Sequence, residues 1–140
     1  MRVVLDTSVL VAAARSRQGA SHVLVSAIPT IEFQFCLSVG LYGEWQDVLT
    51  RSEHLPPELT PEDALRFLRY LASHAYLQEI HFLWRPFLSD PDDDMVLELA
   101  FAAGCSHIVT HNVKDFHGAE QLGITAVTPG DFLKLIRSKS

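Results

Sequence analysis

The sequence predicts an α/β fold: a three-layer α/β/α sandwich with a mostly parallel central sheet. Short apolar, β-branched runs alternate with amphipathic helical segments along the whole chain, which is typical of a parallel sheet covered by helices on both faces. A length of 140 residues suffices for a substantial core around one sheet. No internal repeat, low-complexity tract or linker divides the chain, so we expect a single domain over residues 1–140.

The chain begins with a short apolar run of β-branched type that predicts a strand over residues 3–5. Thr7 or Ser8 then offers an N-cap to a helix over 9–14. Apolar residues at helical spacing predict a second helix over 20–28.

The next segment, over residues 31–37, has the β-branched and aromatic content that favours a strand. Ser38 can cap a helix over 39–51. Thr60-Pro61-Glu62-Asp63 combines a cap, Pro at the first helical position and acids in the first turn, and leucines follow at a spacing of three. A helix therefore begins at Pro61.

The last part of the chain continues the alternation. Residues 77–83 predict a strand, and the segment Ser89-Asp90-Pro91 introduces a helix over 92–103 that stops at Gly104. The remaining expected elements are short strands over 108–110 and 124–127 and a helix over 129–136.

The formal net charge of −6 is unusual for a nucleic-acid enzyme, because phosphate binding usually leaves a basic footprint. If several of the 17 acidic residues share one cation-binding pocket, metals rather than Lys and Arg would receive the phosphate. No apolar run approaches the roughly 20 residues that span a bilayer, and Asp6 comes too early for a signal peptide. We therefore expect a cytoplasmic protein without membrane association.

Cysteine and tryptophan residues are expected in the core. Cys36 and Cys105 are far apart, lie in no CxxC motif and have apolar neighbours, which favours buried free thiols over a disulfide or zinc site. Trp45 and Trp84 are interpreted as core residues in preference to base-stacking platforms.

Three acidic clusters are expected at one edge of the sheet, because ligands of open parallel sheets collect at the carboxyl ends of the strands. Asp6 follows the first strand, Asp92 and Asp93 open a helix, and Asn112 and Asp115 follow the strand over 108–110. An acid in such a place alone is more often a helix cap, but three together indicate a site.

The geometry of the expected helix makes Glu44 a fourth candidate for the site. It lies on the flank of an expected buried stripe, whereas Asp47 lies farther toward solvent. The stripe consists of Leu41, Trp45, Val48 and Leu49.

Together these residues resemble the PIN-domain family, and most closely its VapC-like branch of type II toxin–antitoxin ribonucleases. The resemblance covers nearly the whole chain. It is carried by Val3 to Leu10 with Asp6-Thr7-Ser8, by Ser38 through Glu44 to Leu49, by Asp90-Pro91-Asp92-Asp93-Asp94 through Ala100, and by Ile108-Val109-Thr110-His111-Asn112 with Asp115-Phe116.

The resemblance implies a PIN-like domain that is a metal-dependent endoribonuclease, a cognate antitoxin partner and a homodimer. It assigns catalysis and metal binding to Asp6, Glu44, Asp93 and Asp115, and a supporting role to Ser8, Thr110 and Asn112. Many family members have Asp at the position of Asn112, so Asn112 and Asp115 both remain candidates for the nearer metal contact.

The chemistry of these residues suits Mg²⁺ or Mn²⁺, which prefer carboxylate and water oxygens. Such a cation offsets the repulsion between the carboxylates, activates a water and stabilises the charge that develops on phosphorus. The expected reaction is in-line hydrolysis of an RNA phosphodiester, which by family precedent leaves 5′-phosphate and 3′-hydroxyl ends. One or two metals remain possible.

The three consecutive acids Asp92, Asp93 and Asp94 leave open which of them faces the proposed site. A buried stripe of Val96, Leu99, Ala100 and Ala103 predicts that Asp94 faces solvent and leaves Asp92 and Asp93 on the two flanks. The resemblance selects Asp93 and leaves Asp92 as a first-turn acid.

Other polar residues have weaker claims. His111 is close enough in sequence to the acids to contact substrate. Arg15, Arg17 and Lys114 could bind phosphates, although solvated loop charge is at least as common.

Competing functions fit less well. A haloacid-dehalogenase-like phosphatase normally has a second Asp two residues after the first, where this chain has Ser8, and a dinucleotide-binding fold would have GxGxxG after the first strand. The alternative that remains is a PIN-like module that binds RNA or protein without cleavage.

Overall fold

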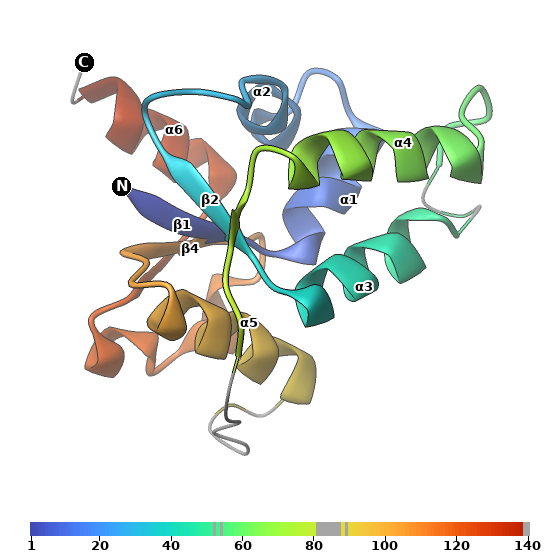
Figure 1. Ribbon diagram of the computed structural model, residues 1–140. Coiled ribbons are helices and arrows are strands. Elements are labelled where there is room, and N and C mark those ends of the chain that lie inside the picture. The colour runs from blue at the N-terminus through green and yellow to red at the C-terminus, as the bar shows by residue number, and fades with distance from the viewer. Residues whose placement is uncertain (52, 54, 81–87, 89, 139–140) are drawn as a thin grey trace.

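A single five-stranded sheet forms the centre of the molecule (Figure 1). The computed structural model describes residues 1–51, 53, 55–80, 88 and 90–138. The strands follow the order β3-β2-β1-β4-β5, and the pairs described are all parallel. The strands are β1 (Arg2–Leu5), β2 (Gln34–Leu37), β3 (Tyr76–Leu77), β4 (His107–Val109) and β5 (Thr125–Val127). The predicted central parallel sheet is confirmed.

Helices cover both faces of this sheet. Helix α5 contacts β1, β2 and β4 on one face, whereas α1, α2 and α6 pack side by side on the other, as Figure 1 shows. The helices are α1 (Thr7–Arg15), α2 (Ala20–Ser26), α3 (Val39–Leu49), α4 (Pro61–Ala72), α5 (Pro91–Ala102) and α6 (Pro129–Ser138), with 3-10 turns η2 (Val113–Phe116) and η3 (Ala119–Leu122). Within the described ranges, the helices are too short or too polar to cross a membrane.

Predicted capping residues fix where several helices begin and end. The Ser38 side chain accepts from Leu41 N–H at 3.1 Å. Thr60 and Asp63 form a reciprocal capping box at the start of α4. Gly104 has a φ of +68°, a left-handed conformation that suits glycine just past the end of α5.

Two strands are shorter than predicted, at opposite ends. β2 begins only at Gln34, which pairs with Arg2 at the start of β1, and ends at Leu37 as predicted because Ser38 begins α3; β3 therefore has no β2 partner beyond Leu77. Gln78 N–H still donates to Leu37 O at 2.9 Å, but the strand predicted over 77–83 does not continue through residues 78–80. The rest of that prediction, and Trp84, lie outside the described residues.

The core lies between the sheet and its helices. Trp45 is fully buried and stacks on Phe35 with ring centroids 6.2 Å apart. Both cysteines are buried and free, as predicted.

Asp94 contradicts the prediction that it faces solvent. It is only 2% exposed, and its Oδ1 accepts from Leu88 N–H at 2.7 Å. The predicted stripe of α5 is buried, but Leu97 and Glu98 are buried as well. The helix is therefore buried on more than one side, with Leu88 in contact at Asp94, and a single apolar stripe does not describe its environment.

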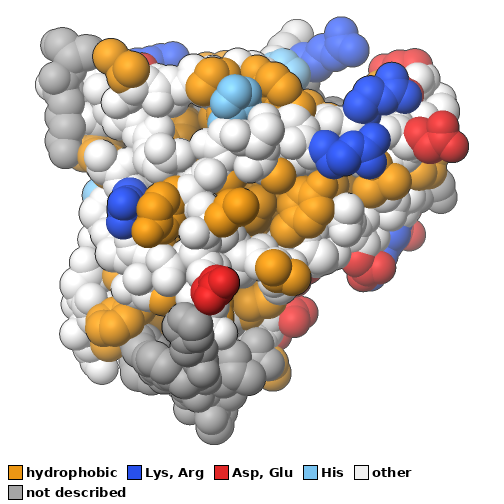
Figure 2. Space-filling model, viewed as in Figure 1, with side chains coloured by type: hydrophobic (Ala, Val, Ile, Leu, Met, Phe, Trp, Pro, Cys, Tyr) orange, Lys and Arg blue, Asp and Glu red, His pale blue; other side chains and the backbone are white. Residues whose placement is uncertain are grey.

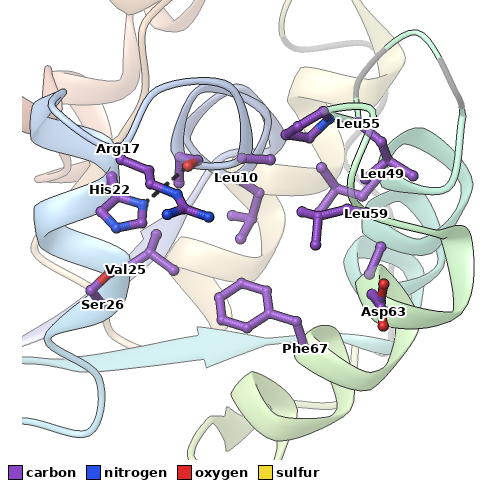
Figure 3. A pocket seen from close by; sticks show the side chains of 14 residues that line it. Leu10, Arg17, His22, Val25, Ser26, Leu49, Leu55, Leu59, Asp63 and Phe67 are labelled. Carbon is purple, nitrogen blue, oxygen red and sulfur yellow. Dashed lines mark hydrogen bonds between the residues drawn. The ribbon is translucent and has the colours of Figure 1, made fainter.

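An apolar hollow of about 280 Å³ lies between α1, α2 and α4 (Figure 3). Leu10, Leu59 and Phe67 contribute to its walls, and Phe67 remains 42% exposed. Hydrophobic side chains form a broken band across the face of the molecule shown in Figure 2. The acids predicted to bind metal do not line this hollow.

The Asp94 contact predicts a stability effect without a catalytic one. Asp94→Ala leaves the Leu88 N–H without its acceptor, which should lower the free energy of unfolding by about 1–3 kcal/mol. Asp94→Asn keeps an oxygen acceptor and should lose less. Thermal melts of the metal-free variants measure both, and an Ala variant that melts with the wild type would contradict the contact.

Candidate active site at the carboxyl edge of the sheet

The pairing of β1 with β4 brings the residues that follow these two strands to the same edge. Leu5 pairs with Val109, and Asp6 N–H donates to Val109 O at 2.9 Å. Thr110 N–H in turn donates to Val127 O at 2.9 Å. Asp6 and Thr110, far apart in sequence, therefore begin adjacent loops.

The Asp6 side chain does not cap helix α1. Asp6 occupies the N-cap position of α1, one residue before the predicted caps Thr7 and Ser8, yet its side chain makes no capping hydrogen bond. Instead, Ser8 Oγ and Thr110 Oγ1 both donate to Asp6 Oδ2 at 2.8 Å. With 8% of its surface exposed, Asp6 is a buried carboxylate oriented by two hydroxyls.

The predicted supporting residues extend this network. Thr110 Oγ1 accepts from Asn112 N–H at 2.9 Å, and Ser8 Oγ accepts from His111 N–H at 3.1 Å. The structure thus places Ser8, Thr110 and the Asn112 backbone around Asp6. Neutral donors hold the carboxylate without cancelling its charge.

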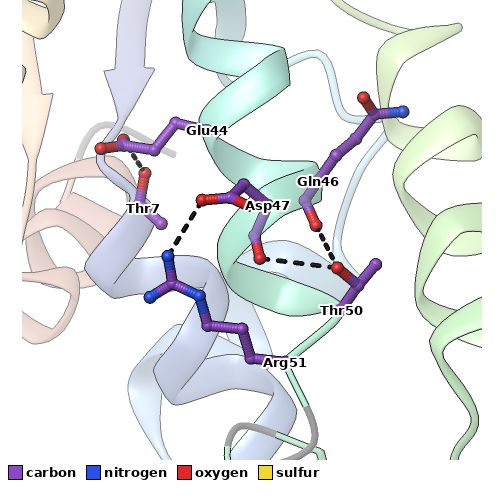
Figure 4. Close-up of polar contacts among 6 residues, drawn as sticks. All are labelled: Thr7, Glu44, Gln46, Asp47, Thr50 and Arg51. Carbon is purple, nitrogen blue, oxygen red and sulfur yellow. Dashed lines mark hydrogen bonds and ion pairs between the residues drawn. The ribbon is translucent and has the colours of Figure 1, made fainter.

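Glu44 reaches the same edge from α3 (Figure 4). Thr7 Oγ1 donates to Glu44 Oε2, a contact that joins α3 to the first residue of α1. Glu44 is half-buried, whereas Asp47, one turn on, is exposed and paired with Arg51 at 2.9 Å. The predicted contrast between these two acids is confirmed.

Asp93 lies half-buried in the first turn of α5. Burial, and then the negative charges of nearby acids, raise the pKa of its carboxyl to about 7. These acids are Asp90, Asp6, Asp115 and Asp92. Asp115 itself is exposed in η2, and Asp90 caps α5 by accepting from Asp92 N–H at 2.9 Å.

Burial likewise raises the pKa of Glu44, against the opposing hydrogen bond from Thr7. The charges of Asp92, Asp6 and Asp90 raise it further. Asp93 and Glu44 both lie within electrostatic reach of Asp6, Asp90 and Asp92, and Asp93 also within reach of Asp115, which makes six acids in all. Removing these six from the chain's 17 acidic residues leaves 11, equal to its 11 Lys and Arg, so the net charge of −6 corresponds to this edge.

The sequence matches the PIN domain family over residues 2–114. The chain belongs to the PIN-domain family. The match covers the segments that supply Asp6, Glu44 and Asp93 and ends one residue before Asp115. No curated protein matches this PIN domain in sequence.

Solved structures share the fold of this PIN domain. A chain of VapBC-1 from nontypeable Haemophilus influenzae aligns with a TM-score of 0.62 and 16% identity, over 93% of this chain and 99% of that chain. A chain of VapBC2 from Rickettsia felis, bound to a DNA fragment from their promoter, aligns with a TM-score of 0.63 and 16% identity, over 90% and 98%. The predicted three-layer α/β/α architecture is that of these chains.

The acids of the PIN domain gather without forming a compact ligand group. Among the described residues, no three His, Cys, Asp or Glu side chains are arranged to hold a metal ion. Asp6 and Glu44 are instead held by hydroxyls, and Asp93 and Asp115 interact with the others through charge. Carboxylates of this kind suit Mg²⁺ or Mn²⁺.

Three contributors to the edge were not singled out from the sequence. The sequence indicates a helix cap at Thr7, whose hydroxyl in fact binds Glu44. It indicates a helix start at Asp90, whose charge also acts on both Asp93 and Glu44. Ser21 contacts His111 across 90 residues, which no sequence spacing indicates.

The raised pKa of Asp93 predicts a pH dependence of stability. The folded protein retains a proton on Asp93 that the unfolded chain releases between about pH 4 and 7, so the stability of the metal-free protein should fall as pH rises through this window. Asp93→Asn should weaken this decline and raise the melting temperature at pH 8 by about 3 °C or more.

Asp47→Asn removes an exposed acid and is the matched control. It should keep the wild-type pH dependence. Identical curves for wild type and Asp93→Asn would show that Asp93 is not destabilised by its neighbours.

Proposed function

We propose that this protein is a metal-dependent endoribonuclease that hydrolyses RNA phosphodiester bonds, and the toxin of a toxin–antitoxin pair. The observation that carries the proposal is the convergence of six acids at the carboxyl edge of a parallel sheet in a PIN domain. A purely structural role would not require so many like charges at one place. A cation would offset their repulsion.

Asp6, Glu44, Asp93 and Asp115 are the proposed metal-binding and catalytic residues. Their oxygens are the donors that Mg²⁺ or Mn²⁺ prefers, and the site has no cysteine that would favour zinc. Bonds from Ser8 and Thr110 orient Asp6, and the bond from Thr7 orients Glu44. These hydrogen bonds orient the carboxylate oxygens of Asp6 and Glu44 without the help of a cation.

A bound cation would supply Lewis-acid chemistry, which lowers the pKa of a water and stabilises charge on the phosphate. In the proposed reaction, water attacks phosphorus in line, and the bond from phosphorus to the 3′ oxygen breaks. The attacking water gives one proton to solvent or to an edge carboxylate, and the 3′ oxygen takes up a proton from solvent and leaves as a hydroxyl. A 5′-phosphate remains on the other fragment.

The proposed partners are RNA and a cognate antitoxin protein. The antitoxin is supported by the sequence resemblance to VapC-like toxins and by the fold shared with chains of two VapBC structures. A homodimer is the corresponding expectation for the oligomeric state, and the cytoplasm for the location. The alternative is a PIN-like module that binds RNA or protein without cleavage. Its main support is the acidic net charge, and the acids gathered at the proposed metal site account for that charge.

The central test is turnover of single-stranded RNA by purified protein. Wild type should cleave in Mg²⁺ or Mn²⁺ and not in EDTA, and Asp6→Asn and Asp93→Asn should lower the rate by at least about 100-fold. Asp94→Asn should retain most activity, because the contact of Asp94 is structural: its side chain accepts a hydrogen bond from Leu88 N–H. Gel analysis of labelled RNA gives the rates and the chemistry of the new ends.

Two outcomes would contradict this assignment. Turnover that is unchanged in EDTA would exclude the metal, and a dispensable Asp93 with an indispensable Asp94 would overturn the register at α5. Asp92→Asn should have a small or intermediate effect.

A toxin should also arrest bacterial growth when expressed alone. Glu44→Gln should relieve the arrest because it removes a charge from the edge, whereas Asp47→Asn, on the same helix but exposed and paired with Arg51, should not. Growth curves at matched protein level measure the effect. Arrest that persists in Glu44→Gln would indicate a mechanism other than cleavage at this edge.

A further inference from the structure

His111 is anchored at two points beside the acidic edge. Its backbone N–H donates to Ser8 Oγ at 3.1 Å, and Ser8 itself donates to Asp6. Its ring Nε2 lies 2.7 Å from Ser21 Oγ, on helix α2. The His111 ring is therefore fixed to the same network that orients Asp6.

The two partners differ in exposure. Ser21 is 2% exposed, so its hydroxyl is within the protein, whereas His111 is an exposed residue. A buried hydroxyl that binds one nitrogen of an exposed ring leaves the other nitrogen, Nδ1, for an external group. If Ser21 donates to Nε2, the neutral ring carries its proton on Nδ1 and presents an N–H donor.

We propose that His111 donates a hydrogen bond from Nδ1 to a backbone phosphate of RNA next to the scissile one, and that Ser21 is the positioning residue that fixes its ring. This inference rests on the proposed ribonuclease function. An RNA strand at the edge brings several phosphates toward six acids, and the cation accounts for the scissile phosphate. A donor beside Asp6 provides a contact for a neighbouring phosphate without a salt bridge that would neutralise the edge.

The side-chain variants separate a hydrogen bond from ring stacking. His111→Asn keeps an N–H donor close to the position of Nδ1, whereas His111→Phe keeps a ring and loses the donor. None of these changes removes the backbone N–H that binds Ser8, so the Asp6 network stays in place. Ser21→Ala keeps the His111 ring but frees it, and Ser26→Ala, an exposed serine of the same helix, is its control.

The experiment measures the affinity for a fluorescein-labelled single-stranded RNA 12-mer in Ca²⁺, by anisotropy, and kcat and KM in Mg²⁺. His111→Phe should weaken binding and raise KM about tenfold, with kcat little changed. His111→Asn should stay within about threefold of wild type, and Ser21→Ala should raise KM by about threefold. In ¹⁵N spectra, wild type should show the proton of the neutral ring on Nδ1, and Ser21→Ala should lose this preference.

Several results would overturn the proposal. A Phe variant that binds like wild type while Asn is weakened indicates base stacking, and a fall in kcat at constant KM indicates a structural effect on Asp6. Equal affinity in all variants removes His111 from the interface. Wild type that binds RNA without cleaving it refutes the ribonuclease proposal but still allows the His111 comparison, whereas wild type that cleaves with no effect of His111 refutes this inference alone.

Discussion

Repulsion between carboxylates gathered at one edge of the sheet is the constraint on which the rest of the site depends. Parallel pairing of β1 with β4 makes both strands end at the same edge, and the start of α5 brings a further acidic turn to it. The half-buried Asp93 shows the result, because burial and four neighbouring acids raise the pKa of its carboxyl to about 7. Such an arrangement is unfavourable alone, and the proposed cation would offset the repulsion.

The protein tolerates this charge by using neutral hydrogen-bond donors. Hydroxyls of Ser8 and Thr110 bind Asp6, and the Thr7 hydroxyl binds Glu44. The bond from Thr7 lowers the pKa of Glu44, and none of these hydroxyls adds a positive charge that would compete with a metal. Among the described residues, the ion pairs Arg51–Asp47 and Arg66–Asp63 instead involve acids outside the edge. The positive side chains of these two pairs do not neutralise the proposed site.

The sequence predicts where β1, β2 and β5 end and most helices, because local signals determine them: Ser38, Thr60 and Gly104 each act on their own neighbourhood. It fails at Asp94, since periodicity shows one buried stripe and cannot show that Leu88 contacts a second side of α5. The choice of Asp93 over Asp92 came from family resemblance and stays a prediction. The bond between Ser21 and His111 joins residues 90 apart and depends on how α2 packs, which spacing does not encode.

An acidic protein can bind RNA if its charge is local. Outside the edge the chain is balanced, with 11 acidic and 11 basic side chains, so no general repulsion of a polyanion is expected away from the site. At the edge itself, the proposed RNA substrate would be repelled until a cation bound, and further phosphates would then need donors that leave the cation in place. Backbone amides and neutral side chains meet this requirement better than Arg, because an Arg beside Asp6 would pair with the carboxylate that the metal needs. His111, bonded to Ser8 and Ser21, is the proposed donor beside Asp6.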